Sequence, residues 1–309
     1  MRLTLTCKLR KTFLAILVLG LVLSFTLSGC GQPSSDPQAQ QIAVRTISAM
    51  NAAKSYKLNA YMTENYTVVE KSNPLITTEP LQWTSQRQVD MLNQEMYLSM
   101  DNSGSGATYA FEKYLVDGWE YYAQSSPRIG LTIPWIKTKL DQQYNMWSHE
   151  AQVTPQIELL KTAESISMAG TENVDGNDAY VINVVPSAEA AADWVLSQEQ
   201  YSGPSVGWFR TSPERSREIY IKAYKDGFVR LWIDKDNDLI LKVSVSLLFD
   251  GVPGNILSLD TGLEVTIGED PTDVGFEHII RDFNGRWEFS DYNKPVDIQL
   301  PEEALNAAE

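Results

Sequence analysis

Residues 203–207 have the residue types and spacing of a catalytic motif. They read Gly-Pro-Ser-Val-Gly, which fits the Gly-x-Ser-x-Gly pattern of a serine nucleophile. In hydrolases that serine stands on a sharp turn between a buried strand and a helix, whereas the residues on both sides of this motif are polar. We therefore interpret the motif as a polar turn, and hydrolysis by Ser205 is the least favoured alternative.

A second motif is similar to the beginning of a calcium-binding loop. Asp234, Asp236 and Asp238 alternate as they do in such loops. The glycine and the glutamate that the loop requires are missing, because Leu239 and Val245 stand in their places. The sequence favours a tight β-turn with solvated carboxylates.

Histidine and cysteine offer no other metal or catalytic site. His149 and His278 are the only histidines, and neither has a metal-ligand spacing to the other or to a cysteine. We predict no metal, no cofactor and no catalytic residue, and thus a protein that is not an enzyme.

The strongest motif directs covalent attachment of lipid. Residues 27–30 read Leu-Ser-Gly-Cys and follow a basic start and an apolar run from Thr12 to Leu27. This is the pattern at which bacterial lipoprotein precursors are diacylated on the cysteine and then cut before it. An uncleaved membrane anchor is the alternative, but the run is shorter than the roughly 20 residues that span a bilayer. We predict a signal peptide at 1–29 and a lipid on Cys30, which anchors the protein on the extracytoplasmic side of a membrane in the cell envelope.

Composition limits the other partners of the chain. Cys7 leaves with the signal peptide and Cys30 carries lipid, so no thiol remains for a disulfide. The net charge of −15 becomes still more negative when the basic signal peptide is removed, and it repels phosphate groups. This excludes nucleic acid as a partner. Eight Trp, 14 Tyr and 9 Phe supply apolar area, so we expect any lipid to contact an apolar interior that holds no buried charge.

The elements that position these residues begin with a helix and continue mainly with strands. Residues 30–38 form a polar tether after the lipidated cysteine, and apolar residues at three- and four-residue steps predict a helix over 39–53. Thr154-Pro155 opens a predicted helix that ends at Lys161, and Ser187 caps another over 188–198. Outside these helices, apolar and polar residues alternate with a period of two, which is typical of β-strands.

Alternation and turn residues predict a series of antiparallel strands. Met96, Leu98 and Met100 are expected to face inward, with Tyr97 and Ser99 outward, because a strand alternates its faces. Asp-Gly or Asp-rich turns predict four hairpins, and two more strands are expected between residues 255 and 290. The hairpins cover residues 109–123 with a turn at 117–118, 166–185 with a turn at 175–177, 218–233 with a turn at 225–227, and the strands that flank 234–238.

These elements predict an α+β fold that is mainly antiparallel β. About ten or eleven strands with short turns form one curved half-barrel sheet, and a few helices pack on its concave face. Residues 39–309 are predicted to form this single domain.

The layout resembles a group of bacterial lipoproteins, namely LolA and the LppX/LprG-like and outer-membrane lipoprotein-sorting-like proteins. Five stretches carry the resemblance: the lipid-attachment motif with its tether, the first helix running into 53–56, the hairpin 174–182, the pair 231–234 and 241–243, and the ending 289–304. The resemblance implies an open half-barrel wrapped over helices, an apolar cavity for acyl chains and no catalytic residues. Residues 127–152 and 198–217 look like insertions that could cap the cavity or fill it.

We therefore predict a lipoprotein that binds or carries a lipid, or a lipidated molecule, in an apolar cavity. A non-enzymatic sensor or interaction module with a protein partner in the envelope is the alternative. The residues expected to line the cavity are Ile47, Met50, Leu98, Phe111, Ile182, Trp194, Ile221, Leu231 and Val245.

Overall fold

From Ser35 onward, all the described strands belong to a single antiparallel sheet. The computed structural model describes residues 35–70, 76–77, 80–103, 109–126, 130–140, 154–199, 213–252 and 276–307. The strands are β1 (Ser55–Glu70), β2 (Ile76–Thr77), β3 (Leu81–Asp90), β4 (Glu95–Ser103), β5 (Tyr109–Val116), β6 (Trp119–Ser126), β7 (Leu131–Lys139), β8 (Ala163–Val174), β9 (Asn177–Pro186), β10 (Tyr224–Asp234), β11 (Ile240–Val252) and β12 (Phe276–Ser290). The helices are α2 (Pro37–Ala52), α4 (Thr154–Lys161), α5 (Ala188–Glu199), α6 (Pro213–Ala223) and α7 (Glu302–Leu305).

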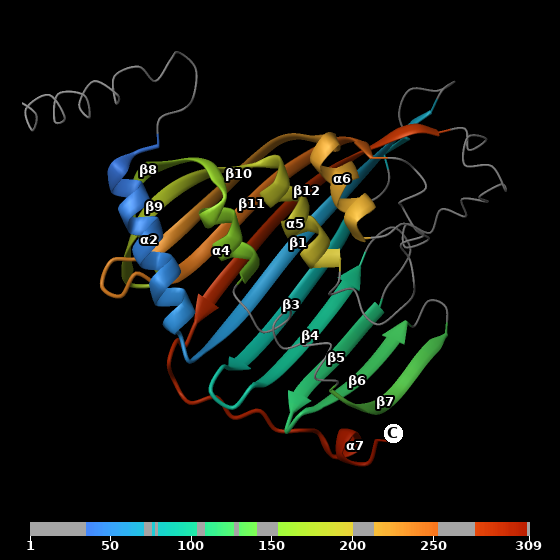
Figure 1. Ribbon diagram of the computed structural model, residues 1–309. Coiled ribbons are helices and arrows are strands. Elements are labelled where there is room, and N and C mark those ends of the chain that lie inside the picture. Colours follow the sequence, from blue (N-terminus) through green and yellow to red (C-terminus); the bar gives the residue numbers. More distant parts are fainter. Residues whose placement is uncertain are drawn as a thin grey trace, which may run out of the picture. The chain divides into compact units, whose positions relative to one another are not determined.

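The sheet is curved and open. Eleven strands lie side by side in the order β7-β6-β5-β4-β3-β1-β12-β11-β10-β9-β8, and β2 pairs with β1 (Figure 1). Every described pairing along this order is antiparallel, with β7 and β8 at the two edges. The predicted fold class is confirmed.

Two hairpins form at the predicted turn residues. Asp117 and Gly118 join β5 to β6 with φ angles of 52° and 76°, and Asp175 and Gly176 join β8 to β9 with φ angles of 51° and 92°. Two successive positive φ angles match the twist of antiparallel strands, and Asp-Gly adopts them at low cost. Local turn chemistry therefore sets the register of both hairpins.

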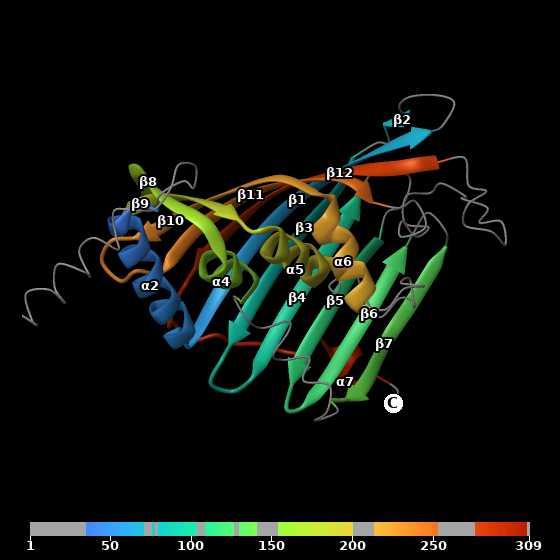
Figure 2. The same cartoon turned by 45° about the horizontal axis from the view of Figure 1, so that its top comes forward.

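The longer helices cover one face of the sheet (Figure 2). Helix α2 packs on β8, α4 and α5 on β9, α5 also on β10, and α6 on β11. Helix α5 begins as predicted, because the Ser187 hydroxyl accepts a hydrogen bond from the Ala190 N–H at 3.1 Å. Helix α2 turns Ala39, Ile42 and other small or apolar side chains into the core. The predicted helices are thus confirmed.

Helix α6 corrects one predicted hairpin. The isoleucines that alternate around Tyr220 predict a strand from Glu218 to Tyr224, but the structure has a helix over most of this stretch. Ser216, Tyr220 and Ala223 recur at helical spacing and are all buried, whereas the flanking isoleucines are only partly buried. Burial of one helical face therefore outweighs the short alternation, and the turn predicted next lies inside β10.

The predicted insertions and the last strands are only partly described. Insertion 127–152 contributes β7, an edge strand in which Pro134 fits because an edge leaves some N–H positions unpaired. Insertion 198–217 overlaps the start of α6. Of the two strands expected between residues 255 and 290, β12 is present, and 253–275 lie outside the described residues.

After β12 the chain turns back, and hydrogen bonds hold it to the start of β1. The Ser55 hydroxyl donates to the Lys294 carbonyl at 2.6 Å, and the Asn293 N–H donates to the Ser55 carbonyl at 3.0 Å. The Lys54 N–H donates to the Asn293 side chain at 2.8 Å. From this anchor the final segment runs past the ends of several strands to α7, which packs near β7 (Figure 1).

Candidate functional site

The face of the sheet that the helices cover is apolar beneath the helices and also on the neighbouring strands β3 and β4. On β4, Met96, Leu98 and Met100 are buried, while Tyr97 and Ser99 on the other face are partly exposed. The predicted register of this strand is confirmed, because a slip by one residue would have exchanged the two faces. Leu81 and Val89 on β3 extend the same surface. The apolar surface thus continues beyond the strands on which the helices pack.

The structure brings the nine predicted cavity residues into one apolar cluster. Seven of them are buried within it: Met50, Leu98, Phe111, Ile182, Trp194, Leu231 and Val245. Ile47 and Ile221 are partly buried and pack against it. Ile221 reaches the cluster from α6 and not from a strand, which corrects its predicted position. The role of these residues as the lining of a cavity stays a prediction.

Two tryptophans join α5 to the sheet. The Trp194 ring meets the Trp287 ring edge-on, with centroids 5.3 Å apart and an interplanar angle of 85°. The Trp287 ring lies so close to Gly285 that a Cβ atom there would fall far inside van der Waals contact. The buried Trp194 Nε1 has no hydrogen-bond partner among the described residues. Ring packing, and the space that a glycine leaves for it, therefore positions α5 at this point.

A buried ion pair interrupts the apolar interior. Glu64 on β1 and Arg281 on β12 pair with side chains only 2% and 5% exposed. The Arg281 guanidinium also donates to the hydroxyls of Tyr220 and Tyr66, and it lies 4.7 Å from the centroid of the Phe283 ring. The expectation of an interior without buried charge is therefore wrong.

Strand alternation predicts the position of one member of this pair but not of the other. Glu64 is in phase with the buried Leu58, Ala60, Met62 and Tyr66 of β1, so the alternation alone turns its carboxylate inward. Its partner stands 217 residues away in the sequence, and no local pattern indicates it. Because Tyr220 belongs to α6, the ion pair also fixes where that helix lies on the sheet.

A second charge pair lies at the other side of the same face. Lys113 of β5 is in phase with the buried Phe111 and Leu115, and its ammonium group is 3.0 Å from the Glu120 carboxylate. The two side chains are 7% and 16% exposed. Polar groups therefore form an edge of the apolar surface near β5 and β6 as well.

The acidic motif at 234–238 is a turn, as predicted, but Asp234 is buried, so the expectation that all its carboxylates are solvated is wrong. Asp234 accepts hydrogen bonds from the Asp236 N–H at 2.8 Å and from the Asn237 side chain at 2.9 Å. Asp238 pairs with Arg45 of α2 at 3.0 Å. Among the described residues no group of three or more metal-binding side chains comes together. The Asp234 carboxylate thus serves the turn, and the Asp238 carboxylate serves its contact with α2.

Several predicted features lie outside the described residues and stay predictions. They are the signal peptide at 1–29, the lipid on Cys30, the serine motif around Ser205, and His149. The other histidine, His278, lies 3.0 Å from the Asp250 carboxylate with its side chain 29% exposed. Within the part of the chain that the structure describes, no helix is long and apolar enough to cross a membrane.

Comparison with known proteins gives matches to solved structures only. No family model matches this chain, and no curated protein sequence matches it. The crystal structure of LprF from Mycobacterium bovis is 13% identical with a TM-score of 0.46, and the match covers 87% of this chain and 99% of LprF. Lipoprotein LppX from Mycobacterium tuberculosis is 13% identical with a TM-score of 0.38, over 86% of this chain and 100% of LppX.

A domain named for outer membrane lipoprotein sorting, from Vibrio parahaemolyticus, also matches. It is 10% identical with a TM-score of 0.24, and the match covers 87% of this chain and 96% of the domain. An open, curved antiparallel sheet with helices on one face is the architecture that the sequence resemblance implies, and the structure has it. At these identities the likeness concerns the fold alone.

Proposed function

We propose that this chain is a lipid-anchored protein of the cell envelope that holds the acyl chains of a lipid, or of a lipidated molecule, against the inner face of its sheet. The apolar surface over β3, β4 and β5 is the observation that carries the proposal. It continues beyond β8–β12, on which the helices pack, and it is rich in long, flexible side chains. Methionine adapts to ligands of loose shape, which suits acyl chains.

The energetics favour an apolar guest at this surface. Each methylene group that leaves water for an apolar contact contributes about 0.8 kcal/mol. Met96, Met100 and Phe111 all face the same side of two neighbouring strands, so an acyl chain lying there would contact several of them at once. The predicted acyl anchor on Cys30 would keep such a protein at a membrane, where its ligand is found.

Native mass spectrometry of the full-length protein tests the proposal. The protein is extracted from bacterial membranes, and a ligand that is not covalently bound is recognised by its release on collisional activation. Leu98→Trp adds a large ring on the inner face of β4, so it should reduce the bound lipid and the uptake of a fluorescent fatty acid. Ser99→Trp adds the same ring on the outer face of the same strand, so it should leave both unchanged.

The same variants distinguish a carrier from the alternative of an interaction module. In a carrier, Leu98→Trp lowers lipid uptake while circular dichroism shows an unchanged fold. In a fully packed interior the new ring instead lowers the free energy of unfolding by about 1–3 kcal/mol. Such a loss, together with no lipid on the parent protein and no fatty-acid uptake, would reject the carrier and favour a sensor or interaction module of the envelope.

A further inference from the structure

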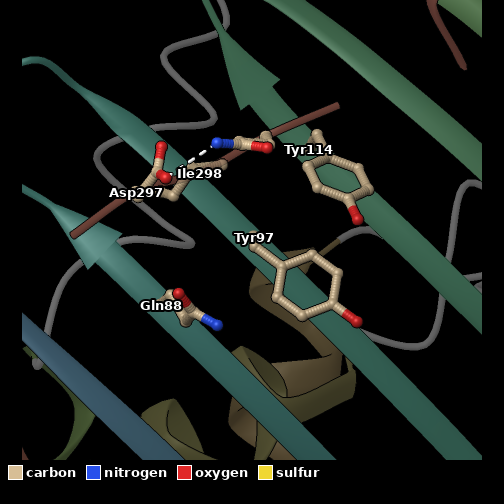
Figure 3. A pocket seen from close by; sticks show the side chains of 6 residues that line it. Gln88, Tyr97, Tyr114, Asp297 and Ile298 are labelled. Atoms are coloured by element: carbon tan, nitrogen blue, oxygen red, sulfur yellow. Dashed lines mark hydrogen bonds between the residues drawn. The ribbon is translucent and has the colours of Figure 1, made fainter. Parts of the chain in front are cut away.

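A polar pocket of about 300 Å³ lies on the face of the sheet opposite the helices. Gln88, Tyr97 and Tyr114 form its floor and stand directly opposite one another on β3, β4 and β5. The segment after β12 crosses above them and contributes Asp297 and its two successors, Ile298 and Gln299 (Figure 3). Two parts of the chain that are distant in sequence thus build one concave site.

The floor of the pocket is an aromatic platform. The centroids of the Tyr97 and Tyr114 rings are 4.8 Å apart, and the interplanar angle is 40°. The ring of Trp135 on β7 is the next in the row, with its centroid 5.7 Å from that of Tyr114. The two tyrosine rings are side by side on the sheet and too close together to enclose a cation between them (Figure 3). The platform therefore suits a ligand with a flat apolar face that stacks on it.

The rim of the pocket supplies hydrogen-bonding groups of both kinds. The Gln299 amide donates to the Asp297 carboxylate at 2.8 Å, which leaves further oxygen and N–H positions directed to solvent. Burial raises the pKa of Tyr114 to about 12 and also raises the pKa of Tyr97, so both hydroxyls stay protonated at neutral pH and can donate. Gln88 adds a second amide to the floor.

Charge selects among the flat ligands that such a site could hold. Asp297 is the only charged residue of the six that line the pocket, and the whole chain carries a net charge of −15. Nucleotides and acidic sugars are repelled by this field. A neutral sugar ring combines a flat C–H face with hydroxyl groups that both donate and accept.

We propose that this outer-face pocket binds a neutral saccharide, which stacks on Tyr97 and Tyr114 and forms hydrogen bonds with Asp297 and Gln299. Trp135 continues the platform toward the sheet edge, so a chain of several sugar units fits better than a single sugar. The site is separate from the inner face and is independent of lipid binding.

Saturation-transfer NMR and calorimetry on the full-length protein test this site. The protein is kept in a detergent without a sugar headgroup, and the probes are cellotetraose, maltotetraose and chitotetraose. At least one should bind, and Tyr114→Ala should weaken its Kd about tenfold or more, since tenfold equals the loss of about 1.4 kcal/mol. Gln299→Ala, at an exposed position of the crossing segment, should also weaken binding without affecting the sheet.

Matched controls make the result decisive. Tyr61→Ala removes a tyrosine ring that is 46% exposed on β1 and does not line the pocket, so it should leave the Kd unchanged. A tetrasaccharide of galacturonic acid should bind at least tenfold more weakly than the neutral probes, because it is anionic. The proposal is overturned if no neutral probe binds, if the acidic probe binds as tightly, or if neither Tyr114→Ala nor Gln299→Ala weakens binding.

Discussion

Replacement of Glu64 by glutamine gives the sharpest test of the buried ion pair. The change keeps the shape of the side chain and removes only its charge. It removes the charge of the carboxylate that pairs with the Arg281 guanidinium, a side chain only 5% exposed. Removal of one member of a buried pair destabilises proteins by about 3–5 kcal/mol, because the remaining charge stays desolvated.

The structure places the expected loss near the lower end of this range. Arg281 is still surrounded by aromatic rings, with centroids 5.3 Å away for Tyr66, 5.3 Å for Tyr220 and 4.7 Å for Phe283. Cation–π contacts of this kind contribute about 0.5–2 kcal/mol and partly compensate for the missing carboxylate. We therefore expect Glu64→Gln to lower the free energy of unfolding by about 3 kcal/mol.

Urea denaturation followed by circular dichroism measures this loss. Glu288→Gln is the matched control, because Glu288 pairs with Arg286 on the same strand β12 with side chains 42% and 56% exposed. An exposed pair contributes less than about 1 kcal/mol. Replacing both members of the buried pair, by Glu64→Leu with Arg281→Met, should recover most of the lost stability. Equal losses for Glu64→Gln and Glu288→Gln would refute the reasoning.

Three further predictions follow from other parts of the molecule. Gly285→Ala should destabilise by about 1–3 kcal/mol in urea denaturation and change the near-ultraviolet dichroism, because its methyl group displaces a packed tryptophan ring. Hydrogen bonds from Lys294 and Lys57 lower the pKa of Asp291 from 3.8 to about 2, so NMR should show its carboxylate protonating only near pH 2. The stability from these contacts should be complete above about pH 4 and lost as the pH falls toward 2; protonation near pH 4 would contradict this. Cys30→Ser should abolish incorporation of labelled palmitate, and undiminished labelling would reject Cys30 as the acylated residue.

Much of the local structure could be predicted from the sequence, because its causes are local. Alternation on β4 assigns Leu98 to the inner face and Tyr97 to the outer face without knowledge of the neighbouring strands. Asp117-Gly118 determines a hairpin because few other residue pairs adopt two positive φ angles at low cost. The start of α5 at Ser187 follows from a hydrogen bond between residues three positions apart.

The ion pair and the outer pocket were decided only by the tertiary structure. The strand order sets β1 between β3 and β12, and this brings Glu64 beside Arg281 from 217 residues away. The same return of the chain carries Asp297 across Tyr97 and Tyr114, which the sequence identifies only as outward-facing residues of a sheet. A period of two determines the face on which a side chain lies. Its neighbours on that face depend on which strands pair, and long-range burial determines that pairing.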